Sequence, residues 1–392
     1  MFKKKHSRRK AAVLPSIFVN LLNKLCCINA TFSAYFRLKH KMVRITFILT
    51  ALIVSLTVSC TKEGDIIYKD DPDFEPTRTP LVTVIYSPDG LGDQSYSDLI
   101  YKGVEDAAAS KVLRTLQLSP ISYDDGAKCI EAAIDQMSTA NDSIRRLLIV
   151  TSAAYDDVVR ENSSRLDNNP NSDILYLETR TPLTSKGSTL FIQYYGAMYE
   201  AGAVAPIIAP EVLLIGANPE NDAVAEAVNG FQDGFNAGYI DTEDYKNLVL
   251  RYIGDGFIID DTTALEIMFT PDWEGIDQIL VPICGGAGGT FNRLCDVFGL
   301  YQYVGIDRQQ VSSKCHFSVL KHVDRAVFKC IDDWLQGQMQ KHYSFGLSDG
   351  YTELAVHPYL DEYKNYFSTK LTDALRQQIR EDAVKKEAGY AN

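Results

Sequence analysis

Polar residues and glycines follow several apolar segments of this 392-residue sequence, at the points where strands would end. The segments 87–96, 152–155, 284–290 and 307–310 are rich in Gly, Asp, Ser and Thr. These residue types suit hydrogen bonds to a polar small molecule, and glycine lets a ligand come close to the backbone. Each segment alone is typical of an ordinary strand-to-helix turn, but together they indicate a ligand-binding cleft.

Alternating strand-like and helical segments would hold these residues in place. Nearly continuous apolar runs predict strands buried on both faces, at 81–86, 146–151, 174–177, 212–216, 278–283 and 303–307. A helical pattern follows the first run, from about 95 to 113. The alternation predicts an α/β fold with parallel sheets, in which ligands bind at the carboxyl ends of the strands. Roughly 310 residues follow Pro80, which is enough for two such lobes.

The sequence shows no catalytic constellation and no metal-binding motif. HExxH is absent, and His316, His322, His342 and His357 show no metal-ligand spacing. The pattern GxSxG occurs once, at 346–350. The glycine-rich run 285–289 lacks the Lys-Ser/Thr ending of a P-loop and the complete spacing of a Rossmann turn. We therefore expect no enzyme activity, no metal and no cofactor. The glycine run is interpreted as a tight turn or a point of close ligand approach.

Five cysteines follow Cys60, namely Cys129, Cys284, Cys295, Cys315 and Cys330. Their odd number and the absence of CxxC argue against a disulfide framework. We expect buried free thiols, with one disulfide as the alternative in an oxidising compartment.

Charge is distributed unevenly along the chain. The first 59 residues hold eleven Lys and Arg and no acid, so all 51 acids lie in the remainder, against 28 bases and with a net charge of −23. The apolar run 45–58 follows basic residues and is shorter than the roughly 20 residues that a membrane-spanning helix needs. This arrangement is typical of an export signal ahead of an acidic domain. Export and acidity together exclude nucleic acid as a partner.

The apolar run ends at Ser59-Cys60 and resembles the lipobox of bacterial lipoproteins, in which cleavage precedes a cysteine that carries a diacylglycerol. We expect a lipid-anchored protein of the cell envelope that faces the periplasm or the cell surface. The alternative is an uncleaved signal anchor with a chance cysteine. Met42 would make a normal start for the signal. The acidic, proline-containing residues 61–79 predict an extended linker.

Short motifs along the chain resemble those of the basic membrane protein (PnrA-like) family, the substrate-binding lipoproteins of ABC transporters. Residues 93–97, with Gly103 after them, resemble the family's DxSFN…G opening, and 230–238 resemble its GFxxGxxAG helix. Further segments are similar to family motifs in the same order, at 197–202, 285–288, 305–310, 318–327 and 346–350. The resemblance covers residues from about 81 to 355.

The resemblance implies the type I periplasmic-binding fold, with two doubly wound parallel-sheet lobes joined by crossover strands and a nucleoside closed between them. It implies that Tyr96 stacks on the base and that Asp307 and Lys321 hold the ribose hydroxyls, a role that suits their chemistry. A structural ion pair between the lobes is the alternative for Asp307 and Lys321.

Two departures concern the base end of the site. Ser87 and Gly92 stand where the family has aspartates, and Asp89 is a candidate substitute for the first of them. A site that lacks such a polar partner loses affinity for the base. The ligand would then be a different nucleoside or another solute.

These observations predict a ligand site, a division of the chain and a function. The predicted ligand-binding residues are Ser87, Asp89, Asp93, Tyr96, Ser152, Gly286, Asp307 and Lys321. The expected parts are a signal region (1–59), a lipidated linker (60–79), a first lobe (80–190 with 308–342), a second lobe (191–307 with 343–358) and a helical tail (359–392).

The predicted function is that of a lipid-anchored solute-binding protein, which holds a nucleoside-like small molecule for an ABC permease. A sensor or surface interaction protein of the same fold, without a transport role, is the alternative. A third possibility, an enzyme that cleaves nucleosides, is not supported, because the sequence offers no acid–base pair for that reaction.

Overall fold

The computed structural model describes residues 78–390 apart from 89, 141, 240–246, 255, 270–277, 300 and 357–369. All described residues belong to the unit Asp73–Asn392. The expected signal segment, Cys60 and the expected linker up to residue 77 lie outside the described residues, as do Asp89 and His357.

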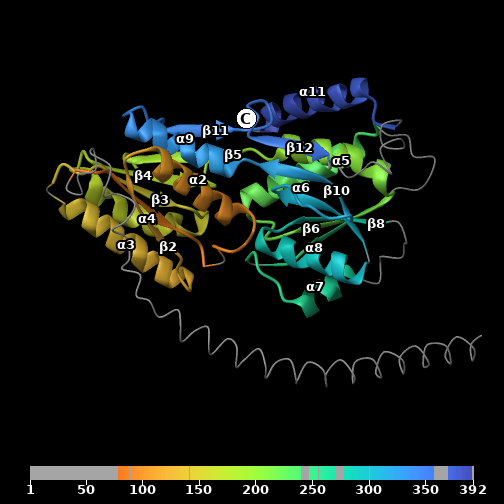
Figure 1. Ribbon diagram of the computed structural model, residues 1–392, viewed down its shortest axis with the longest axis horizontal. Helices are drawn as coiled ribbons and strands as arrows, with labels where there is room; N and C mark the ends of the chain where they lie inside the picture. Colours follow the sequence, from red (N-terminus) through yellow and green to blue (C-terminus); the bar gives the residue numbers. More distant parts are fainter. Residues whose placement is uncertain are drawn as a thin grey trace, which may run out of the picture. The chain divides into compact units, whose positions relative to one another are not determined.

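Two six-stranded sheets organise the described chain (Figure 1). The first has the order β11-β5-β4-β3-β1-β2 and is parallel throughout. The second has the order β12-β10-β9-β8-β6-β7, and its β12 is antiparallel to β10. The strands of the first sheet are β1 (Leu81–Ile85), β2 (Arg114–Leu118), β3 (Arg146–Val150), β4 (Ser172–Leu177), β5 (Gly187–Ile192) and β11 (His342–Phe345). Those of the second are β6 (Glu211–Gly216), β7 (Asn247–Tyr252), β8 (Gln278–Ile283), β9 (Gln302–Asp307), β10 (Cys315–Lys321) and β12 (Thr352–Val356).

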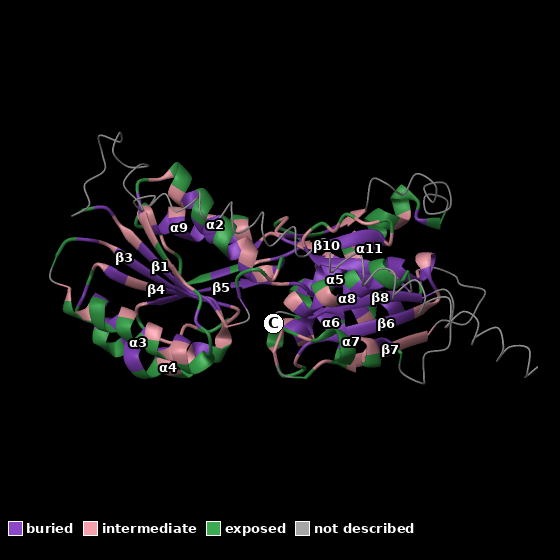
Figure 2. Cartoon of the chain, turned by 60° about the horizontal axis from the view of Figure 1, so that its bottom comes forward, coloured by how far each residue is buried: buried purple, intermediate pink, exposed green. Residues whose placement is uncertain are grey.

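Helices cover both faces of the first sheet (Figure 2), as its buried strands require. One face carries α2 (Tyr96–Ser110) and α9 (Val323–Leu335), and the other carries α3 (Tyr123–Thr139) and α4 (Asp156–Asn162). Successive residues of β1 point to opposite faces, so Val84 packs in the cluster with α2 and α9 whereas Ile85 packs in the cluster with α3. The 3-10 helices η1 (Ala153–Tyr155) and η2 (Ser163–Leu166) flank α4.

The second lobe contains the closely packed pair α5 (Tyr195–Ile208) and α6 (Asp222–Asn236). A Cβ atom on Gly202 of α5 would lie 2.0 Å from the carbonyl oxygen of Phe231, and one on Gly234 of α6 would lie 2.0 Å from that of Tyr199. The glycine motif at 230–238 therefore has a packing cause, since larger residues would push the helices apart. The other helices of this lobe are α7 (Asp261–Met268), α8 (Gly286–Phe298) and α11 (Asp373–Tyr390).

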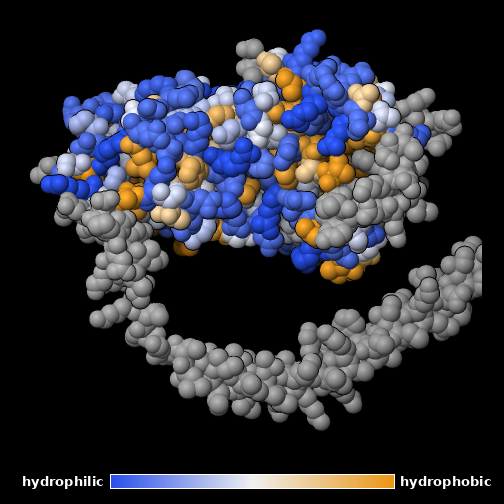
Figure 3. All heavy atoms as spheres, turned by 45° about the horizontal axis from the view of Figure 1, so that its top comes forward, coloured by the Kyte–Doolittle hydropathy of each residue, from blue (hydrophilic) through white to orange (hydrophobic). Residues whose placement is uncertain are grey.

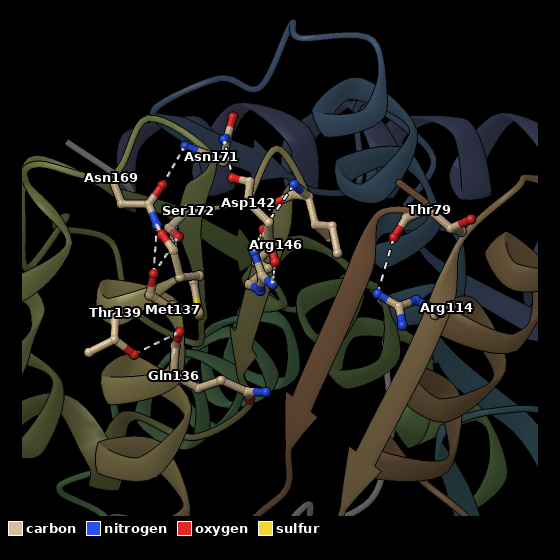
Figure 4. Close-up of polar contacts among 12 residues, drawn as sticks. Thr79, Arg114, Gln136, Met137, Thr139, Asp142, Arg146, Asn169, Asn171 and Ser172 are labelled. Carbon is tan, nitrogen blue, oxygen red and sulfur yellow. Dashed lines mark hydrogen bonds and ion pairs between the residues drawn. The ribbon is translucent and has the colours of Figure 1, made fainter. Parts of the chain in front are cut away.

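Polar contacts connect the segments at the amino ends of the strands of the first sheet (Figure 4). The Arg146 guanidinium donates to both carboxylate oxygens of Asp142, at 2.7 and 2.8 Å, and lowers the pKa of Asp142 to about 2. Asn169 donates to the carbonyl of Met137 at 2.6 Å. Because these contacts fill the amino ends of the strands, the carboxyl ends of the strands are left to form a ligand site.

The surface is mostly hydrophilic on the face that Figure 3 shows, with hydrophobic residues in small groups. The most exposed large apolar side chains, Ile121, Val311, Val297 and Ile258, belong to different segments. Among the described helices, none has both the length and the apolar composition to cross a membrane.

The strand pairing corrects the expected division of the chain at two places. Residues 308–342 were expected in the first lobe, but β10 pairs with β9 and β12 in the second sheet. Residues 343–358 were expected in the second lobe, but β11 pairs with β5 in the first sheet. An apolar run shows that a strand is buried and does not show which sheet receives it. The described chain therefore crosses between the lobes after β5, after β10 and after β11.

The expected helix from 95 to 113 also differs, because α2 ends at Ser110 and β2 begins at Arg114. Residues of β2 are partly exposed, so this edge strand lacks the continuous apolar run of the central strands.

The C-terminal helix α11 packs on α5 and holds two crossover segments together. Leu371 and Ile379 are buried in the core of the second lobe, and residues 359–369 of the expected helical tail lie outside the described residues. The buried Glu387 accepts hydrogen bonds from the backbone N–H groups of Gly196 and Leu347, at 2.9 and 2.8 Å. Burial raises the pKa of Glu387 to about 7, although these bonds oppose the shift.

We predict that Glu387→Gln makes stability less dependent on pH. The folded pKa lies above the unfolded value, so ionisation of Glu387 destabilises the fold as the pH rises through about 7, by up to about 3 kcal/mol. Melting temperatures measured between about pH 5 and pH 8 should fall for the wild type and fall less for the variant. Glu381→Gln on the exposed side of α11 is the control. An equal fall in melting temperature for Glu387→Gln and for the wild type over this pH range would contradict the prediction.

Candidate functional site

A cavity of about 110 Å³ lies where residues at the carboxyl ends of strands from both sheets meet. Seven of the eight predicted ligand-binding residues line it, namely Ser87, Asp93, Tyr96, Ser152, Gly286, Asp307 and Lys321. The eighth, Asp89, lies outside the described residues. Residues more than 200 positions apart thus share one cavity, and their role toward a ligand stays a prediction.

Lys321, the last residue of β10, is the only lysine that lines this cavity among the described residues. Its side chain is 5% exposed, and its ammonium forms an ion pair of 3.0 Å with Glu178 of the first lobe. It also lies 5.3 and 5.4 Å from the ring centres of Tyr96 and Tyr194. Burial works against the charged form, but Glu178 and Asp307 outweigh it and raise the pKa of Lys321 above its usual value. The ammonium is therefore held charged among aromatic faces and carboxylates.

Asp307, the last residue of β9, has a left-handed backbone with φ 65°. The hydroxyl of Ser95, from the first lobe, donates to its carboxylate. Its backbone N–H donates to the Tyr194 hydroxyl at 3.1 Å, and that hydroxyl donates in turn to the carbonyl of Val319 at 2.7 Å. Burial raises the pKa of Asp307, and the charge of Lys321 opposes the shift. The carboxylate is thus held in place from both lobes.

Asp93 has a local role that its motif did not reveal. Its carboxylate accepts from the backbone N–H groups of Ser95 and Ser97, each at 2.8 Å, at the start of α2. These are the N–H groups that a helix start leaves unpaired, so Asp93 caps α2 and fixes the position of Tyr96. Most of its acceptor capacity is used in this way.

Within the glycine run 285–289, Gly285 forms the turn between β8 and α8, and the residues from Gly286 onward belong to α8. Gly285 has φ 54°, which suits glycine, and a Cβ atom on it would lie 3.1 Å from Phe257. Gly286 begins α8 and lines the cavity beside Asp93. The interpretation as a tight turn therefore holds for Gly285, and close ligand approach at Gly286 stays a prediction. On the first lobe, Ser152 lines the cavity and its hydroxyl accepts from the N–H of Ala154 at 3.2 Å.

Sequence reasoning missed Glu178, Tyr194 and Phe257, which also line the cavity. Glu178 comes directly after β4, so the rule that the residues after each strand form the site would have found it. Tyr194 follows β5, a strand that the apolar pattern did not predict. Phe257 lies in a loop after β7, and no local pattern marks it as a cavity residue.

The five described cysteines are free, as expected. Cys284, Cys295, Cys315 and Cys330 are buried, whereas Cys129 is partly exposed. Within the described part of the chain, no group of His, Cys, Asp and Glu side chains could hold a metal ion.

Comparison with known proteins gives matches in structure and none in sequence. No family model matches the chain, and no curated protein matches it. An ABC transporter solute-binding protein from Aeropyrum pernix K1 is 16% identical with a TM-score of 0.56, over 80% of this chain and 86% of that chain. A transcriptional activator of the comK gene from Bacillus halodurans is 16% identical with a TM-score of 0.59, over 79% and 97%. An ABC transporter solute-binding protein from Burkholderia graminis, in complex with D-arabinose, is 13% identical with a TM-score of 0.50, over 74% and 99%.

The chain has the type I periplasmic-binding fold. Two parallel-dominated α/β sheets and three crossovers agree with the expectation from the sequence. At these identities the likeness shows the fold alone. Membership of the basic membrane protein family stays a prediction, because no family model matches.

We predict that Lys321→Met destabilises the fold strongly. The substitution keeps most of the side-chain volume but leaves the carboxylates of Glu178 and Asp307 without their buried cation. Breaking one partner of a buried pair costs about 3–5 kcal/mol, and chemical unfolding should show a loss of this size. Lys128→Met, at an exposed position of α3, is the matched control. If Lys321→Met loses no more unfolding free energy than Lys128→Met does, the ion pair between Lys321 and Glu178 does not stabilise the fold.

Proposed function

We propose that this chain is an extracytoplasmic solute-binding protein that closes its two lobes on a sugar-containing small molecule, with a nucleoside as the expected ligand, for an ABC-type permease. The observation that carries the proposal is the placement of Asp307 and Lys321 beside Tyr96 in a cavity formed by both lobes. The solved structures of the same fold that are named as solute-binding proteins support it.

The chemistry of the cavity suits a polyhydroxylated ligand. A carboxylate such as Asp307 accepts hydrogen bonds from two hydroxyls, the Lys321 ammonium donates to a third oxygen, and the Tyr96 ring covers an apolar ring face. A volume of about 110 Å³ equals that of about four water molecules in the liquid, at roughly 30 Å³ each. That is the size class of a pentose, so a nucleoside would need its base to extend beyond this space, with Tyr123 and Phe257 among the aromatic residues of the lining.

The charges of the cavity favour a neutral ligand. Asp93, Glu178 and Asp307 bring three carboxylates to the lining, whereas Lys321 brings one ammonium. A phosphate group would add negative charge beside these three carboxylates, and like charges at short range repel one another. We therefore expect nucleosides or free pentoses to bind better than their phosphorylated forms.

We predict that calorimetry of the full-length protein in detergent detects binding of inosine, adenosine, D-ribose or D-arabinose, and that AMP binds at least about tenfold more weakly than adenosine. Asp307→Asn should weaken the binding of the accepted ligand by about tenfold or more, because a buried hydroxyl partner loses its acceptor. Asp157→Asn, on the exposed surface of α4, is the control.

Failure of all four neutral probes to bind, or equal binding of AMP and adenosine, would contradict the proposal. A sensor of the same fold would bind ligand equally well. Uptake of labelled inosine by cells with and without the protein separates that alternative from transport.

We also propose that Cys60 carries the lipid anchor, on the strength of its position after the apolar run 45–58. Cells grown with labelled palmitate should incorporate label into the wild type and into Cys129→Ser, but not into Cys60→Ser. Label that survives in Cys60→Ser, or is absent from the wild type, would contradict the anchor. Absence from the wild type would favour the uncleaved signal segment.

A further inference from the structure

Three residues other than glycine have positive φ in the described part of the chain, and two of them, Glu178 and Asp307, line the cavity. The three are Gln94 with φ 52°, Glu178 with φ 64° and Asp307 with φ 65°. Such a backbone is strained when the residue is not glycine, and it persists where the surroundings impose it, most often at functional sites. Asp307 already belongs to the predicted ligand site, whereas Glu178 has no assigned role.

Glu178 and Asp307 occupy equivalent places in the two lobes. β4 and β9 are each third in the strand orders β11-β5-β4-β3-β1-β2 and β12-β10-β9-β8-β6-β7. Asp307 is the last residue of β9, and Glu178 comes directly after β4. Both carry a carboxylate, both have nearly the same φ, and both line the same cavity. The two lobes therefore present matching acidic groups to one ligand space.

The position of Glu178 is fixed by contacts that leave it able to accept more hydrogen bonds. Its backbone N–H donates to the carbonyl of Leu190 at 3.0 Å, which anchors it to β5. Its side chain is 15% exposed, pairs with Lys321 at 3.0 Å and accepts a hydrogen bond from the Tyr96 hydroxyl. A carboxylate has about four lone-pair positions, so these two partners leave room for ligand hydroxyls.

We propose that Glu178 is a ligand-binding residue that determines specificity. This inference rests on the proposed function. Glu178 and Asp307 accept hydroxyl groups of the same sugar from opposite lobes, and Lys321, paired with Glu178, donates to an oxygen of that sugar. The ligand class is therefore a neutral polyol whose hydroxyls reach both lobes, and full affinity requires the two carboxylates to be engaged together.

A purely structural ion pair between the lobes leads to a different expectation. If Glu178 only tied the lobes together through Lys321, its loss would weaken every ligand by the same factor. If it accepts one hydroxyl, its loss should have no effect on the analogue that lacks that hydroxyl. A set of deoxy analogues therefore separates the two roles.

Calorimetry of the full-length protein in detergent should use inosine and its 2′-, 3′- and 5′-deoxy analogues, with D-ribose and D-arabinose as further probes. We expect Glu178→Gln to weaken inosine binding by about tenfold or more and to leave the binding of one deoxy analogue unchanged. Asp307→Asn should show the same pattern with a different analogue. Glu161→Gln, at an exposed position of α4, is the control.

Glu178→Asn is the second variant, because Asn tolerates the left-handed backbone and keeps the position polar. It should show the same analogue dependence as Glu178→Gln. The role of Glu178 is overturned, and the proposed function stands, if a Glu178 variant that melts within the range of the control binds all analogues more weakly by the same factor. The same conclusion follows if such a variant binds inosine as tightly as the wild type does. Failure of the wild type to bind any probe overturns the proposed function itself, and this inference with it.

Discussion

The buried ammonium of Lys321 is the interaction on which the arrangement of the site depends. An isolated charge at 5% exposure would be too costly to keep, so the fold must bring carboxylates to it. One comes from β9 of the same sheet and one from the end of β4 in the other lobe. Because the nearest partner belongs to the opposite lobe, satisfying this one charge also specifies how the two lobes meet at the cavity.

The position of Lys321 in the chain connects this charge to the crossovers. It is the last residue of β10, and His322 and Val323 then lead into α9 of the first lobe. The crossover after β5 is also close to this charge, because the ring of Tyr194 lies against the Lys321 ammonium and its hydroxyl accepts from the Asp307 backbone. A ligand that moves the Lys321 ammonium or the Asp307 carboxylate would therefore affect the crossover after β5 and the crossover after β10 together.

Several features of this arrangement could be predicted from the sequence, and the reason differs between them. The central strands were predictable because burial on both faces leaves continuous apolar runs, as in 146–151 and 278–283. Seven residues that line the cavity were predictable because they follow strands or match motifs. The membership of β10 was not, because pairing with β9 and β12 is a long-range property that a short apolar segment does not encode. Asp93 shows a further limit, since its motif predicts a residue of the cavity lining but not that its carboxylate caps α2.

Carboxylates also organise the crossover after β5, and this bears on how the lobes can move. Glu226 of α6 is buried, accepts from the backbone N–H groups of Tyr194 and Tyr195, and pairs with Arg180 of the first lobe. Glu387 accepts from the next N–H group, that of Gly196. Two acids of the second lobe therefore satisfy three consecutive donors at the start of α5, which the helix itself leaves unpaired. This anchors the start of α5 to its own lobe, while the Glu226–Arg180 pair ties the same point to the first lobe, so a change in the angle between the lobes would have to break or shift that pair.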